Sequence, residues 1–194
     1  MSMSEFRAAN SALMLMDFQN AIVGMVGEAA PALLERAQKA RAAAKASGMA
    51  VMHVRVAFTE ADYAAIPDRN KSFSALGKSR FITDGGEAAA IHPALAPAPD
   101  EEVFTKKRVG AFSTTNLSER LKARGIDTLF LAGIATSGVV LSTLRDAADR
   151  DYRLFVLSDV CADQDAEVHR VLLEKVFPRQ SDVIDLAAFT AMTK

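Results

Sequence analysis

The chain has 194 residues, half of them hydrophobic, which is enough to form the core of a single domain without disulfide bonds. Its 23 basic and 24 acidic residues give a net charge of −1, which argues against a nucleic-acid-binding surface or attachment to an anionic membrane. One cysteine, no signal-peptide pattern and no run of ~20 apolar residues lead us to expect a cytoplasmic protein without disulfides or membrane spans.

Apolar strands alternate with helices along the whole chain. This alternation predicts βαβ units, and therefore an α/β fold with a parallel sheet, in one domain covering residues 1–194. Pro31 suits the first turn of the first long helix and Gly48 suits its end. The predicted strands are residues 12–16, 50–56, 101–105, 128–132, 153–157 and 183–184, and the predicted helices are residues 31–46, 117–124, 138–150 and 166–177.

Residues 58–100 interrupt this alternation and predict a long loop or lid. The segment leaves from the carboxyl end of the second strand, so it can reach over a site there. A loose surface excursion is the alternative, although Phe73, Phe81 and Ile82 argue against complete disorder. Polar and basic residues near its start either meet an anionic substrate or form a solvated cluster, namely Arg55, Arg69, Asn70 and Lys71.

Residues 129–145, LFLAGIATSGVVLSTLR, predict a strand, a small-residue turn and a helix in direct succession. In parallel sheets, ligands occupy the crevice at the carboxyl ends of the strands. A helix that begins there directs free backbone N–H groups at the crevice, and Ser137 is a suitable N-cap. The alternative is an ordinary turn whose small residues allow close packing.

Two other strands end on ionisable residues. SALMLMDFQ ends its apolar run on Asp17, and VFTKKRVGAF ends its strand on Lys106. Taken singly, Asp17 is equally a turn former and Lys106 a solvated strand end. At one sheet edge, however, a carboxylate and an ammonium beside a helix start can exchange protons and hold developing negative charge.

These segments together resemble the isochorismatase-like hydrolase family, from about residue 11 to about residue 184. The matching motifs are LMLMDFQ, TKKRVGAFSTTNL, GIDTLFLAGIATSGVVLSTLRDA and YRLFVLSDVCAD with EVHRVLLEKVFP. The resemblance implies a three-layer α/β/α domain around a six-stranded, mostly parallel, doubly wound sheet. Many members of this family are amide-cleaving cysteine hydrolases with an Asp-Lys-Cys triad, whereas others cleave the vinyl ether of isochorismate without the cysteine.

The sequence departs from the cysteine-hydrolase pattern at the nucleophile. Counting from Gly133 and Thr136, Val139 stands where those members carry the cysteine, and valine forms no acyl-enzyme. The one cysteine, Cys161, follows a later strand and is interpreted as a core or loop residue. Asp17 and Lys106 remain as a dyad.

The resemblance also implies substrate contacts, a backbone feature and an assembly. The Ile134–Ala135 peptide is expected to be cis, and the protein to be a homo-oligomer, at least a dimer. No cofactor is expected, and no metal either, because His53, His92 and His169 lack ligand spacing. The candidate substrate-binding residues are Phe18, Gln19, Arg55, Phe112, Ala135, Thr136 and Gly138.

The sequence therefore predicts a hydrolase of a small anionic metabolite, with cysteine-independent acid/base chemistry by Asp17 and Lys106. Two alternatives stay open. One is a catalytically inactive relative that binds a small molecule or a protein. The other is an amide hydrolase in which water replaces the cysteine and Asp17 acts as the base.

Overall fold

Six parallel strands form one sheet in the computed structural model, which describes residues 6–194. The strand order is β3-β2-β1-β4-β5-β6, and each neighbouring pair is parallel. This confirms the predicted α/β class, and the sheet is entirely rather than mostly parallel. The strands are β1 (Ser11–Met16), β2 (Ala50–Val56), β3 (Glu102–Lys106), β4 (Thr128–Ile134), β5 (Arg153–Ala162) and β6 (Asp182–Ile184).

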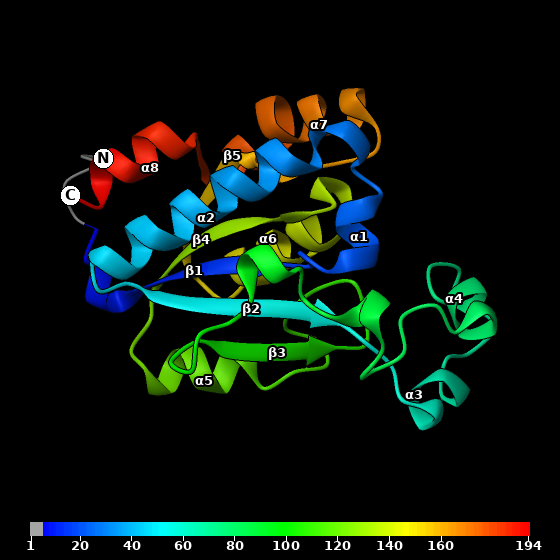
Figure 1. Ribbon diagram of the computed structural model, residues 1–194. Coiled ribbons are helices and arrows are strands. Elements are labelled where there is room, and N and C mark those ends of the chain that lie inside the picture. The colour runs from blue at the N-terminus through cyan, green and yellow to red at the C-terminus, as the bar shows by residue number, and fades with distance from the viewer. Residues whose placement is uncertain (1–5) are drawn as a thin grey trace.

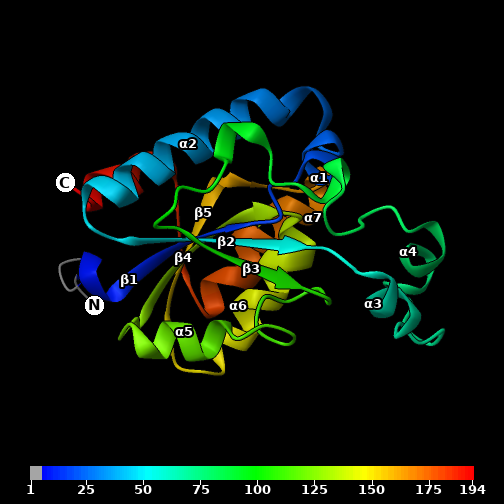
Figure 2. The same ribbon diagram turned by 60° about the horizontal axis from the view of Figure 1, so that its bottom comes forward.

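Helices cover both faces of the sheet. Alternate residues of the central strands point to opposite sides, and because both sets of side chains are apolar, both faces have to be buried. In β1, Leu13 and Leu15 belong to the core under α2 and α8, whereas Met14 and Met16 belong to the core over α5 and α6. Figure 2 shows α2 on one side of the sheet and α5 and α6 on the other. The helices are α1 (Asn20–Gly24), α2 (Ala30–Ala46), α3 (Glu60–Ala64), α4 (Ser74–Ser79), α5 (Leu117–Ala123), α6 (Leu141–Ala148), α7 (Ala166–Val171) and α8 (Leu186–Met192).

The structure differs from the predicted elements mainly at their ends. β4 continues to Ile134, and a π-helical turn at Thr136–Val140 precedes α6. β5 extends to Ala162 because its register against β4 jumps from the Leu131–Val156 pair to the Gly133–Cys161 pair. The short α8 was not predicted. None of the helices in residues 6–194 is long and apolar enough to cross a membrane.

The segment between β2 and β3, predicted as a long loop or lid, has secondary structure of its own. It carries α3 and α4, which project beyond the carboxyl ends of β2 and β3 (Figures 1 and 2). Its own small core contains Phe58, Tyr63 and Phe73, with the Phe58 ring centroid 5.0 Å from that of Tyr63 and 5.8 Å from that of Phe73. These buried aromatic side chains give the segment a defined structure.

Candidate active site

Asp17 begins the turn that ends β1. Its backbone has a left-handed conformation, with φ of 60°, that Asp tolerates better than most residues. The Asp17 N–H donates to the Val54 carbonyl of β2 at 2.8 Å, which continues the ladder one residue past Met16. Such a conformation persists only where its surroundings enforce it, and it often marks a functional position.

Lys106 ends β3 and lies against Asp17. The Lys106 Nζ is 2.9 Å from Asp17 Oδ2 and donates to the Arg108 carbonyl at 3.3 Å. Both side chains are almost fully buried, with 2% of Lys106 and 7% of Asp17 exposed. The two residues come from strands separated by β2, so only the parallel sheet brings them together.

Among residues 6–194, one oxygen of the Asp17 carboxyl group has no hydrogen-bond partner. Asp17 Oδ1 is buried and accepts no hydrogen bond from residues 6–194, whereas Oδ2 faces Lys106. Burial raises the pKa of Asp17 above its ordinary value, and the charge and hydrogen bond of Lys106 offset that rise only in part. Asp17 therefore favours its protonated form more than an exposed carboxyl group does.

The carboxyl end of β4 packs tightly against the end of β1. A Cβ on Gly133 would lie 2.6 Å from the Met16 carbonyl oxygen, so only glycine fits there. The Ile134–Ala135 peptide is cis, as expected. Val139 lies in the following π-helical turn, 2% exposed, within the core that also contains Met16.

A histidine from α7 supports this turn. The Nδ1 atom of His169 is 2.8 Å from Oγ1 of the fully buried Thr136. Burial lowers the pKa of His169, against the opposing charge of Asp163. The sequence analysis did not predict this contact, because its two residues are 33 positions apart and no local sequence pattern indicates it.

Backbone N–H groups of the turn are already bonded. The Ser137 N–H donates to Asp163 Oδ2 at 2.7 Å, and the Gly138 N–H donates to the Ala135 carbonyl at 3.1 Å. The predicted N-cap role of Ser137 is wrong, since the cap position is Ala135 and no side chain caps it. A carboxylate from the β5–α7 connection takes that place.

Two of the candidate substrate contacts hold the chain in position. The Gln19 amide donates to the Val56 and Ala89 carbonyls at 2.7 and 2.8 Å and accepts from the Val56 N–H at 2.7 Å. Phe18 is 1% exposed in the core under α2, and its carbonyl accepts from the His92 N–H at 2.8 Å. Both residues therefore fasten the β2–β3 segment to the end of β1.

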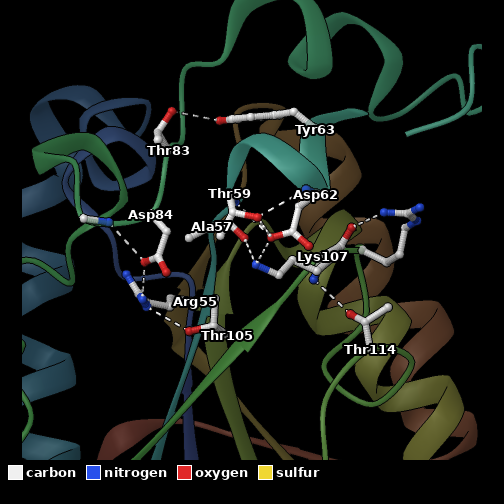
Figure 3. A network of polar contacts seen from close by, with 12 residues as sticks. Arg55, Ala57, Thr59, Asp62, Tyr63, Thr83, Asp84, Thr105, Lys107 and Thr114 are labelled. Carbon is white, nitrogen blue, oxygen red and sulfur yellow. Dashed lines mark hydrogen bonds and ion pairs between the residues drawn. The ribbon is translucent and has the colours of Figure 1, made fainter. Parts of the chain in front are cut away.

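Arg55 and Phe112 are also engaged within the protein. Arg55 donates to Thr105 at 3.1 Å and pairs with Asp84 at 2.6 Å, an arrangement visible in Figure 3. The Phe112 ring stacks on that of Tyr152 at 6.2 Å, with the Arg150 guanidinium 4.9 Å from the Phe112 centroid.

A cavity of about 480 Å³ lies elsewhere, before the amino ends of β4 and β5. Its walls come from α5 and from the α5–β4 and α6–β5 connections, at the end of the sheet opposite Asp17 and Lys106. The lining residues are Ser118, Lys122, Gly125, Ile126, Asp127, Arg150, Asp151 and Tyr152. None of them belongs to the predicted site.

The comparisons with known proteins agree on one family. The isochorismatase domain model matches residues 11–188. An uncharacterized isochorismatase family protein of Escherichia coli O157:H7 is 33% identical, over 91% of this chain and 93% of its own. A ureidoacrylate amidohydrolase of Methylorubrum extorquens is 34% identical, over 79% of this chain and 70% of its own. The crystal structure of a cysteine hydrolase from Pseudomonas syringae pv. phaseolicola has a TM-score of 0.89 at 22% identity, covers 97% of this chain and 94% of its own, and supports the fold.

Proposed function

Because the chain belongs to the isochorismatase family, we propose that it is a hydrolase of a small anionic metabolite that uses the Asp17–Lys106 pair and no enzyme nucleophile. The observation that carries this proposal is the buried 2.9 Å pair in which Asp17 Oδ1 has no partner among residues 6–194. Burying a polar atom without a hydrogen-bond partner costs free energy, and a hydrogen bond from a ligand or a water molecule would offset that cost.

Two features support chemistry without a thiol. The family resemblance implies that Val139 stands where the cysteine-dependent members carry their nucleophile. Burial, together with the charge of Asp159, raises the pKa of Cys161 to about 12 despite a backbone hydrogen bond from Gly133 that lowers it. A thiol with such a pKa is a poor nucleophile at neutral pH.

Hydrolysis of a vinyl ether fits this site. Asp17 in its acid form protonates the terminal alkene carbon, and the ether carbon becomes an oxocarbenium ion. Water adds to that carbon and returns a proton to Asp17, after which the hemiketal releases an alcohol and leaves a keto acid. Lys106 holds the charge of Asp17 once the proton has left.

Amide hydrolysis is the second candidate, and the ureidoacrylate amidohydrolase relative favours it. In this reaction the ionised Asp17 takes a proton from water, and the water attacks the amide carbonyl. The products are then a carboxylic acid and an amine. The two reactions require opposite protonation states of Asp17 in the free enzyme.

The test is a panel of isochorismate, ureidoacrylate, maleamate and nicotinamide, assayed across pH with the wild type and Asp17→Asn. We expect turnover of a carboxylated substrate, and a loss of about 100-fold or more in Asp17→Asn and in Lys106→Met. For the vinyl ether reaction, turnover falls as pH rises through the pKa of Asp17. Turnover that rises with pH, with release of ammonia, assigns the amide reaction instead.

Two controls separate chemistry from folding. Asp146→Asn removes a surface ion pair on α6 and leaves turnover unchanged. Cys161→Ala and a thiol-blocking reagent also leave turnover unchanged, because Cys161 takes no part. If no panel substrate is hydrolysed, or Asp17→Asn is as active as the wild type, the hydrolase proposal fails and a binding protein takes its place.

A further inference from the structure

Three basic side chains near the carboxyl ends of β2 and β3 are each neutralised by a carboxylate. The pairs are Lys106–Asp17, Lys107–Asp62 and Arg55–Asp84, at 2.9, 2.7 and 2.6 Å, and Figure 3 shows the latter two. The Lys107 Nζ also donates to the Ala57 carbonyl at 2.7 Å. These cations are thus occupied by the protein itself.

Arg108 is the exception in this neighbourhood. Among residues 6–194, no carboxylate lies within 4.0 Å of its guanidinium. The guanidinium lies 5.9 Å from the ring centroid of Phe73, and its Nη1 donates to the neutral Lys107 carbonyl at 2.6 Å. A guanidinium carries five N–H donors, so most of its donors remain available to a ligand.

The backbone of Arg108 is joined directly to the candidate active site. The same Lys106 ammonium that faces Asp17 donates to the Arg108 carbonyl at 3.3 Å. Arg108 is half-buried, and the Phe73 ring of the β2–β3 segment lies beside it. Partial burial weakens the hydration of the guanidinium, and contact with an aromatic ring restricts its orientation.

We propose that Arg108 is a specificity residue that binds the carboxylate of the substrate. This inference rests on the proposed hydrolase function and names its substrate class, a monocarboxylate with a scissile bond near the charge. The planar guanidinium group of an arginine can bind a planar carboxylate through two parallel N–H···O hydrogen bonds. Of the four cations at these strand ends, Arg108 alone has no carboxylate within 4.0 Å among residues 6–194, and one free guanidinium suits one carboxylate.

The bound anion would also help Asp17 to act as an acid. A second negative charge near a carboxylate disfavours its ionised form. A neutral analogue of the substrate therefore lacks both the Arg108 contact and this assistance. Recognition and proton donation become coupled through the charge of the substrate.

The experiment compares Arg108→Ala and Arg108→Lys with a control, Lys78→Ala, which removes an exposed positive charge from α4, in the segment that also carries Phe73. Each is assayed with the best carboxylated substrate and with its methyl ester. For Arg108→Ala we expect KM for the carboxylate to rise about 100-fold, with little change in kcat/KM for the ester. Arg108→Lys recovers part of the loss, and Lys78→Ala shows none.

Binding of acrylate, a small molecule with one carboxylate, distinguishes the two proposals when measured by calorimetry, because it needs no turnover. Acrylate binding that Arg108→Ala abolishes and Asp17→Asn retains supports the anion subsite even if no panel substrate is hydrolysed. Turnover that Arg108→Ala does not alter overturns the subsite and leaves the hydrolase standing. Equal losses on the carboxylate and the ester, equal effects of Lys78→Ala, or no acrylate binding by the wild type at millimolar concentration also overturn it.

Discussion

The surroundings of two buried carboxyl groups, Glu101 and Asp17, shift their pKa values in opposite directions. Both oxygens of Glu101 are bonded, through a two-point contact with Arg41 at 2.8 Å and contacts with His53 at 2.9 Å and the Ala98 N–H at 3.0 Å. Burial opposes its ionisation, yet these donors lower the pKa of Glu101 to about 2. Asp17 has one donor and a raised pKa. The full pairing of Glu101 is typical of a structural carboxylate, whereas the incomplete pairing of Asp17 is the observation on which its proposed reactivity rests.

Glu101→Gln is expected to destabilise the protein in a pH-dependent manner. A carboxyl group whose pKa is lowered by folding adds stability above its ordinary pKa of 4.5, and this stability is lost as pH falls toward 2. Discounting for the partly exposed Arg41, we expect a loss of about 2 to 3 kcal/mol at pH 7. Urea unfolding at pH 7, 5 and 3 measures it.

In that experiment the difference between wild type and variant should shrink from pH 5 to pH 3. Glu35→Gln, which breaks an exposed pair with Lys39 on α2, is the control and should leave the unfolding midpoint unchanged. A difference that is the same at pH 7 and pH 3 would mean that packing, rather than charge, makes Glu101 stabilising.

Among the secondary-structure elements, the close approach of β1 and β4 shapes the site. Met16 is in register with Gly133, and Asp17 follows Met16 directly. Any side chain on Gly133 must displace the Met16 carbonyl, and that displacement reaches Asp17, the next residue. Glycine is therefore required at this position of β4 because the two backbones approach each other closely.

Gly133→Ala should consequently reduce both stability and turnover. The overpacking is expected to cost about 1 to 3 kcal/mol, and turnover should fall even at temperatures where the variant remains folded. Gly24→Ala is the matched control, because its Cβ would meet no atom within 4 Å and helix propensity favours alanine. The midpoint of thermal unfolding and the activity are measured on the same samples. If both equal the wild-type values in Gly133→Ala, β1 and β4 can move apart without affecting stability or turnover.

For the molecule as a whole, the assembly stays a prediction. Large apolar side chains are exposed on two neighbouring parts of the surface, Met25 after α1 at 49% and Val168 in α7 at 38% (Figure 1). Exposed apolar area of this kind favours association. We expect at least a dimer in solution, with light scattering at micromolar concentration as the measurement. A mass of 20.8 kDa throughout a dilution series would contradict it.

The α/β class, the six strands and the two ionisable residues at strand ends could all be predicted from the sequence. These properties are local, because a buried parallel strand is a continuous apolar run and its carboxyl end lies where the run stops. Asp17 and Lys106 were found in this way, and the sheet explains why they meet.

What each polar side chain does could be learned from the folded protein alone. Thr136 meets His169, Glu101 meets His53, and Gln19 meets Val56 across 33, 48 and 37 residues, and no periodic pattern encodes such pairs. The same holds for charge: Arg55 and Arg108 look equivalent in the sequence, yet Asp84 neutralises only Arg55. Local patterns place the backbone, whereas partners distant in the chain set the burial, pairing and protonation on which the chemistry depends.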